Sequence, residues 1–136
     1  MTASTAVALT GFIAWALTLL VLMEALRSKM VATGKIAANG FVPDNSNLSP
    51  FMQRLARAHA NCLEGLPIFG GLMVIALITE RTSVTDPLAF VLLAARVVQS
   101  VIHLASLSPR AVTLRFIAFA VQMAIAVYWA FQLLLG

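Results

Sequence analysis

Four polar residues recur in one stretch of an otherwise apolar sequence, at a spacing that fits one face of a helix. They are Arg54, Arg57, Asn61 and Glu64, at positions i, i+3, i+7 and i+10. At about 100° per residue, they fall within an arc of roughly 80°. The residues that follow, 68–78, are almost wholly apolar. Polar groups that run into such a segment are costly unless something polar meets them, so the pattern indicates a binding site.

A second apolar segment repeats this spacing. Arg96, Gln99 and His103 stand at i, i+3 and i+7, and Arg110 and Arg115 follow near the start of the last apolar segment. Hydrogen bonds between membrane helices contribute only about 0.6 kcal/mol on average, whereas a charge facing lipid at the centre of a span costs about 2.5–3.5 kcal/mol. The two polar faces therefore favour a shared cavity that binds a ligand. Structural hydrogen bonding between helices is the alternative.

The residue types indicate what such a cavity would bind. Arginine is a planar bidentate donor that suits carboxylates and phosphates. Glu64 suits an ammonium group, and Asn61 suits either type of group. We therefore expect a ligand with both charges, such as an amino acid or a peptide, together with an apolar partner from the surrounding lipid. His59 and His103 stand in different segments, so no metal site is expected.

The composition identifies the elements that must position these residues. The chain has 136 residues, of which 61% are hydrophobic and 10% charged, whereas soluble globular domains contain about 25% charged residues. This predicts an all-α integral membrane protein, a single domain over residues 1–136 that forms a bundle of four membrane-spanning helices. The basic residues are scattered at helix ends, so nucleic acid is not an expected partner. A small transporter is disfavoured, because transporter sites usually lie near the bilayer midplane.

Hydropathy and proline positions set the expected boundaries. The predicted spans cover residues 6–26, 51–79, 87–107 and 110–135. Each of the last three begins near a Ser-Pro or Asp-Pro pair, a pattern typical of helix starts. Basic residues gather on the first and third connections, so the positive-inside rule places both on the cytoplasmic side and both termini on the other side.

Two segments of the sequence resemble a known family of membrane proteins. The pattern R-x-x-R-A-H-x-N-x-x-E-x-x-P at residues 54–67 resembles the signature of the MAPEG family, the membrane-associated proteins in eicosanoid and glutathione metabolism. The string L-R-F-I-A-F at residues 114–119 resembles the start of the family's fourth helix. The short spacing from Glu64 to Pro67 looks like bacterial members. The resemblance thus implies a bacterial inner-membrane protein, and the orientation from the positive-inside rule then places its termini in the periplasm and its site near the cytoplasmic face.

The resemblance also implies an assembly and a ligand. It implies a homotrimer that binds glutathione, as cosubstrate, between neighbouring subunits. Arg57, Asn61 and Glu64 would hold the peptide, Arg27 would reach in from the adjacent protomer, and Arg96 would support the site. The full set of candidate glutathione-binding residues is Arg27, Arg54, Arg57, Asn61, Glu64, Arg96, His103 and Arg110.

For the chemistry, the resemblance points to Arg115 as the catalytic residue facing the glutathione sulfur, with Arg110 as its alternative. A guanidinium lowers the pKa of a nearby thiol and favours the thiolate. The implied function resembles that of microsomal glutathione transferase: detoxification by conjugating lipophilic electrophiles or reducing lipid hydroperoxides. Eicosanoid-type members carry an arginine where this chain has Ala60, and tyrosines on the third helix where it has His103. The alternative is a non-catalytic trimeric membrane protein that binds a lipid or a thiol peptide in the same inter-subunit cavity.

Overall fold

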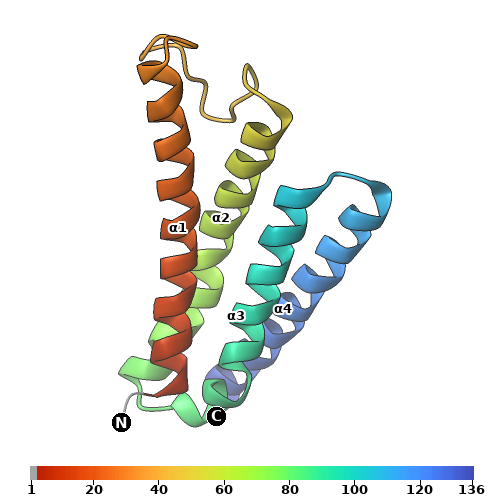
Figure 1. Ribbon diagram of the computed structural model, residues 1–136. Helices are drawn as coiled ribbons and strands as arrows, with labels where there is room; N and C mark the ends of the chain where they lie inside the picture. The colour runs from red at the N-terminus through yellow and green to blue at the C-terminus, as the bar shows by residue number, and fades with distance from the viewer. Residues whose placement is uncertain (1–2) are drawn as a thin grey trace.

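The chain folds into four long helices joined end to end (Figure 1). The computed structural model describes residues 3–136, and these contain no β-strand. The helices are α1 (Ser4–Ala32), α2 (Pro50–Ile78), α3 (Thr82–Ala105) and α4 (Pro109–Leu135). Each is long and apolar enough to cross a membrane. The predicted all-α membrane fold with four spans is therefore confirmed.

Helices α2 and α4 begin as their Ser-Pro pairs predict. Pro50 and Pro109 each stand in the first turn, where the missing N–H removes no intrahelical hydrogen bond. The hydroxyl oxygens of Ser49 and Ser108 each accept a hydrogen bond from the backbone N–H three residues further on, at 3.3 and 3.2 Å. These are N-cap contacts that satisfy a free donor of the first turn.

Helix α3 does not start where the sequence predicts. It begins at Thr82, and Pro87 lies inside it. The additional turn is held by α1, since Asp86 Oδ1 accepts a hydrogen bond from the backbone N–H of Thr5 at 2.8 Å and the hydroxyls of Thr5 and Thr85 are hydrogen-bonded. The predicted start at residue 87 is therefore wrong. The prediction used the local Asp-Pro pair, whereas the observed start depends on a contact with Thr5, which is far away in the chain. The same carboxylate caps the first turn of α1, whose own N-cap residue, Ala3, has no side-chain acceptor.

Helix α1 continues past its predicted end at residue 26. Hydropathy marks only the part of a helix that suits lipid, whereas the helix itself continues through a charged segment to Ala32. It ends in a Schellman motif: Lys35 N–H donates to the Met30 carbonyl at 2.9 Å, and Gly34 N–H donates to the Val31 carbonyl at 3.0 Å. Gly34 has a φ of 73°, a conformation that glycine adopts without strain.

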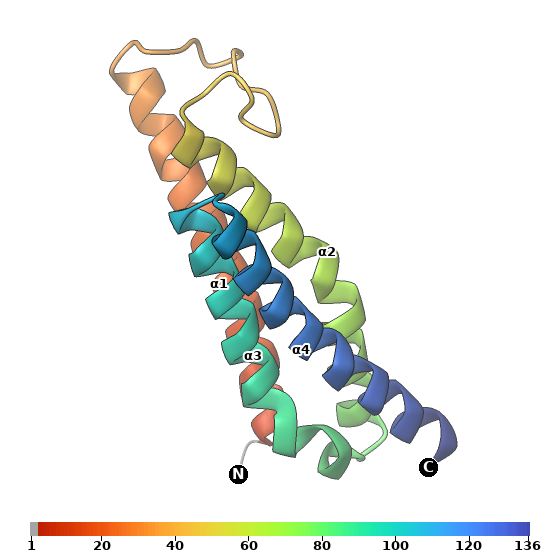
Figure 2. The same ribbon diagram turned by 90° about the vertical axis from the view of Figure 1, so that its right-hand side faces the viewer.

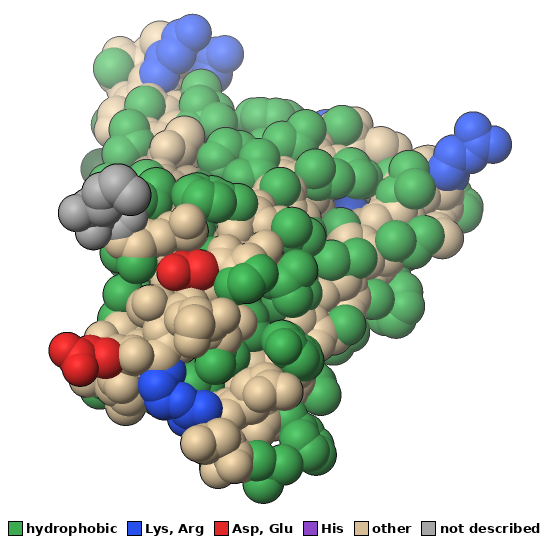
Figure 3. Space-filling view, turned by 90° about the horizontal axis from the view of Figure 1, so that it is seen from below, with side chains coloured by type: hydrophobic (Ala, Val, Ile, Leu, Met, Phe, Trp, Pro, Cys, Tyr) green, Lys and Arg blue, Asp and Glu red, His purple; other side chains and the backbone are tan. Residues whose placement is uncertain are grey.

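The helices form two hairpins that separate toward one end of the bundle (Figures 1 and 2). That end carries the α1–α2 connection and the short α3–α4 turn, and both chain ends lie at the other. Helix α3 packs against the other three helices, whereas α2 and α4 touch over a short length only. Seen from below, the end with the chain termini shows acidic side chains next to one basic group (Figure 3).

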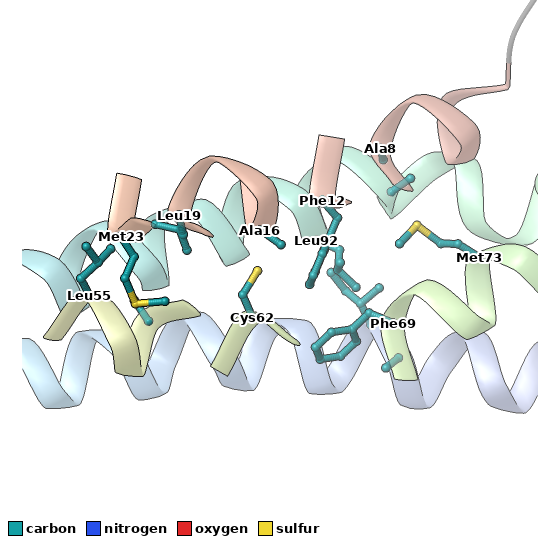
Figure 4. Packing of buried hydrophobic residues seen from close by; sticks show 14 of the residues in the cluster. Ala8, Phe12, Ala16, Leu19, Met23, Leu55, Cys62, Phe69, Met73 and Leu92 are labelled. Atoms are coloured by element: carbon teal, nitrogen blue, oxygen red, sulfur yellow. The ribbon is translucent and has the colours of Figure 1, made fainter. Parts of the chain in front are cut away.

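The core lies mainly between α1, α2 and α3 (Figure 4). Its side chains come from positions three or four residues apart on each helix, as one buried face requires. Among its buried members are Phe12, Leu19, Leu55, Cys62, Phe69, Met73 and Leu92. Large apolar side chains also remain exposed on the outward faces of all four helices. A membrane protein exposes such side chains to lipid, so this surface agrees with the membrane assignment.

Candidate functional site

A cavity of about 320 Å³ opens between α2, α3 and α4. This volume is at the lower end of the range of about 300–1,000 Å³ that small-molecule sites occupy. The cavity brings a guanidinium, a carboxylate and two amides together against aromatic and aliphatic side chains. Its lining residues are Asn61, Glu64, Gly65, Ile68, Phe69, Arg96, Gln99 and Phe119.

Arg96 is the most unusual residue of this cavity, because its charge is buried without an acidic partner. The side chain is 1% exposed. Its guanidinium carbon lies 5.5, 5.7 and 5.9 Å from the ring centroids of Phe12, Phe69 and Phe119. Nη1 donates to the Asn61 carbonyl at 3.3 Å, while Nε and Nη2 have no partner among the described residues. Buried donors are rarely left unpaired, so these two nitrogens call for a hydrogen-bond acceptor.

Gly65 makes room for this guanidinium. A Cβ at this position would lie 2.7 Å from Arg96 Nη2 and 2.9 Å from Phe69 Cε2. Both distances are below any normal carbon contact, so a larger residue would displace Arg96 or the ring. Gly65 is one turn from Asn61 and next to Glu64 on α2, so one helix supplies both the space and two of the polar groups.

Two polar contacts connect the cavity with the surrounding helices. Asn61 Nδ2 lies 3.4 Å from Nδ1 of His103, which is buried behind the cavity and whose Nε2 has no partner in the described chain. On the other side, Gln122 Nε2 of α4 donates to Gln99 Oε1 at 2.8 Å. His103 therefore supports the site through Asn61, and Gln122 supports it through Gln99.

Arg115 lies in a second hollow of about 230 Å³ that adjoins the first. The two hollows share Gln99 and Phe119 as a common wall. Arg115 is half-buried, and its Nε is buried without a partner in the described chain. Arg110 is exposed and lines neither hollow. The geometry therefore favours Arg115 over Arg110 as the arginine nearest a ligand in the cavity.

The remaining predicted arginines lie outside the cavity of the single chain. Arg54 Nε donates to the Leu104 carbonyl at the end of α3, at 2.9 Å. Arg27 pairs with Glu24 at 3.2 Å and donates to Asn45 of the α1–α2 connection. Arg57 is exposed and makes no hydrogen bond to a described residue. The predicted residues that meet at the cavity are Asn61, Glu64 and Arg96, with His103 behind it and Arg115 beside it.

The sequence model of the MAPEG family matches residues 5–135, nearly the whole chain. This protein belongs to the MAPEG family. Comparisons with curated proteins and with solved structures returned no match. Family membership supports a membrane function in glutathione or eicosanoid metabolism in general terms.

In this MAPEG chain, several residues of the site could not be identified from the sequence. Phe69 and Phe119 are apolar residues in apolar helices, and Gly65 shows its role only through the packing of Arg96. Gln122 is different, because an amide in the middle of an apolar span is itself a signal. Among the described residues, no group of three His, Cys, Asp or Glu side chains could hold a metal ion.

Proposed function

We propose that this MAPEG protein is a membrane-bound glutathione transferase that conjugates lipophilic electrophiles with glutathione or reduces lipid hydroperoxides. The observation that carries the proposal is the buried Arg96, with two unpartnered N–H groups, in the same cavity as the Glu64 carboxylate. A ligand with both a carboxylate and an ammonium group would satisfy both residues. Glutathione has these groups, and it is the thiol of the family's metabolism.

The side chains around the cavity suit the two ends of such a peptide. The Glu64 carboxylate would accept hydrogen bonds from the ammonium group. The free Arg96 N–H groups and the Asn61 amide would donate to a carboxylate. The Gln99 amide, already bonded to Gln122, adds a polar wall toward α4. Together these residues would bind and orient glutathione.

Glutathione, when bound, supplies a nucleophilic thiol. In the adjoining hollow, the Arg115 guanidinium would hold negative charge on the sulfur, because a neighbouring cation favours the thiolate. An apolar groove of about 410 Å³ between α2 and α4 includes Pro67, Gly71 and Ala130 and shares Ile68 with the cavity. This groove would let a lipophilic electrophile reach the site from the bilayer.

The proposal includes a homotrimer in a bacterial inner membrane, with periplasmic termini and the site near the cytoplasmic face. Arg27 and Arg57 lie outside the cavity of their own chain, and Arg57 has no partner there among the described residues. A neighbouring protomer would bring Arg27 to the site and use Arg57. The basic α1–α2 connection supports the proposed orientation.

The test uses the purified full-length protein in detergent. Millimolar glutathione should raise the melting temperature, and the protein should conjugate a chloronitrobenzene substrate. Loss of one positioned electrostatic donor typically costs about 10²–10³ in rate, so we expect a decrease of that order for Arg115→Ala, with little change in glutathione affinity. Arg110→Ala should keep its rate.

Glutathione stabilisation and turnover, measured on the same protein, distinguish the transferase from the non-catalytic alternative. The only tyrosine, Tyr128, is half-exposed near the end of α4, so thiol activation would depend on Arg115. Glutathione stabilisation without any turnover would favour the binding protein. Absence of both stabilisation and turnover would rule out the proposal.

A further inference from the structure

A second cavity, remote from the proposed glutathione site, contains both lysines of the chain. It measures about 330 Å³ and lies between the end of α1 and the start of α2. Lys29 and Lys35 are the only lysines in the sequence. The cavity shares no lining residue with the Arg96 cavity. It is therefore a separate candidate site.

The Schellman motif at the end of α1 places the two lysines around one cavity. Lys29 is in the last turn of the helix. The hydrogen bond from Lys35 N–H to the Met30 carbonyl and the positive φ of Gly34 turn the chain back toward that turn. As a result, Lys35 lines the same cavity as Lys29. This arrangement concentrates two positive charges at one end of the bundle.

These charges have no acidic partner. Within residues 3–136, the one ion pair joins Arg27 to Glu24. No aspartate or glutamate lines the lysine cavity. The end of α1 and the start of α2 both border the cavity, so the partial charges of these two helix ends oppose each other and the two ammonium groups dominate its charge. The cavity therefore attracts an anion.

The floor of the same cavity is apolar. Leu26 and Met30 contribute from α1, and Phe51 and Met52 from α2. Phe51 is 38% exposed, so part of this floor is accessible from outside. The cavity lies between the end of α1 and the start of α2. These are two membrane-spanning helices, and the polar α1–α2 connection joins them at this end of the bundle (Figure 1). At that depth a lipid presents its headgroup next to the start of its acyl chains.

From this combination we infer that the lysine cavity binds an anionic phospholipid from the leaflet on the side of the α1–α2 connection. The two ammonium groups bind the headgroup phosphate, and the apolar floor covers the first part of an acyl chain. A free phosphate ion would leave the floor uncovered, and a zwitterionic lipid would bring its own cation next to Lys29 and Lys35. Basic pockets between helices on the cytoplasmic side recognise anionic headgroups in this way.

Thermal stability in detergent, with defined lipids added, tests this inference on the full-length protein. Phosphatidylglycerol should raise the melting temperature more than an equal amount of phosphatidylcholine, and inorganic phosphate should have no such effect. The Lys29→Gln/Lys35→Gln double variant should need about tenfold more phosphatidylglycerol for the same shift. Lys29→Arg/Lys35→Arg keeps both charges and should respond like the original protein. Equal shifts with phosphatidylcholine or phosphate, or an unchanged response of the Gln variant, would overturn the inference.

Labelling of the lysines gives a second readout that needs no variant. In nanodiscs, an amine-reactive reagent should modify Lys29 and Lys35 several times more slowly in phosphatidylglycerol than in phosphatidylcholine. Equal rates in the two lipids would contradict the proposed site. Neither experiment uses glutathione, so both outcomes are independent of the proposed transferase activity.

Discussion

Aromatic faces, and not a carboxylate, surround the buried guanidinium of Arg96, and two of its nitrogens have no partner among the described residues. The three phenylalanines around it come from α1, α2 and α4. A cation over an aromatic face gains about 0.5–2 kcal/mol, and the interaction leaves the N–H groups at the guanidinium edge free. An acidic partner would have occupied those N–H groups. Under the proposed function, the ligand carboxylate would supply the acceptor that Nε and Nη2 lack.

Substitution of Gly65 tests whether glutathione binding depends on the position of Arg96. In Gly65→Ala, the new Cβ would meet both Arg96 Nη2 and the Phe69 ring. Arg96 is enclosed on three sides, so we expect weaker glutathione binding and a loss of about 1–3 kcal/mol in stability from overpacking. Thermal melting with and without glutathione would measure both effects.

The matched control is Gly71→Ala on the same helix. A Cβ at Gly71 would meet no atom within 4 Å. This variant should keep its glutathione affinity and gain up to about 1 kcal/mol from the better helix propensity of alanine. Equal glutathione binding by Gly65→Ala and Gly71→Ala would show that the position of Arg96 does not control the ligand.

At the scale of the helices, Arg54 and Arg57 share one face of α2 but have different surroundings. The last carbonyls of a helix lack intrahelical partners, and Arg54 satisfies one of them at Leu104 of α3. Arg54→Leu should lower stability by about 1.5–3 kcal/mol, the range for a hydrogen bond to a charged group, with a small effect on glutathione binding. Arg57→Leu should instead weaken glutathione binding with little effect on stability, because Arg57 is exposed and makes no hydrogen bond or ion pair with a described residue. Melting curves and glutathione titrations of the two variants would show whether the roles are reversed.

Asp86 joins the starts of two helices. Its carboxylate replaces the N-cap that Ala3 cannot provide for α1. Loss of an N-cap costs about 1 kcal/mol, so Asp86→Ala should lower the melting temperature. Glu80→Gln, in the nearby α2–α3 connection, removes a charge that makes no hydrogen bond or ion pair with a described residue and should have no effect. Equal melting temperatures for the two variants would contradict the capping role of Asp86.

These contacts explain which parts of the structure the sequence could predict. The starts of α2 and α4 were predictable because Ser-Pro caps act within a few residues. The start of α3 was not, because it depends on Thr5. Helical spacing likewise predicted that Asn61, Glu64 and Arg96 would meet in one cavity. The same spacing could not show that Arg54 lies outside this cavity, because Arg54 binds the end of α3 instead.

For the whole molecule, the outer surface and the location of the outlying arginines both favour an assembly. All four helices expose large apolar side chains, which lipid or neighbouring protomers can cover. Lipid alone would leave Arg57 and Glu64 on the exposed side of α2 without a partner. A neighbour that brings in Arg27 would complete the polar site, as the proposed homotrimer requires.

Mixed trimers provide a direct test of a site shared between protomers. Arg27→Ala and Glu64→Gln should each weaken glutathione binding when expressed alone. If each site takes Arg27 from one protomer and Glu64 from the next, random mixing on co-expression restores both residues in about a quarter of the sites of a cyclic trimer. Glutathione titration of the co-expressed sample should then show that fraction at the original affinity, whereas variants purified separately and then combined should not. Failure to recover any high-affinity sites would mean that each protomer builds its site alone, because every chain would then carry one of the two defects.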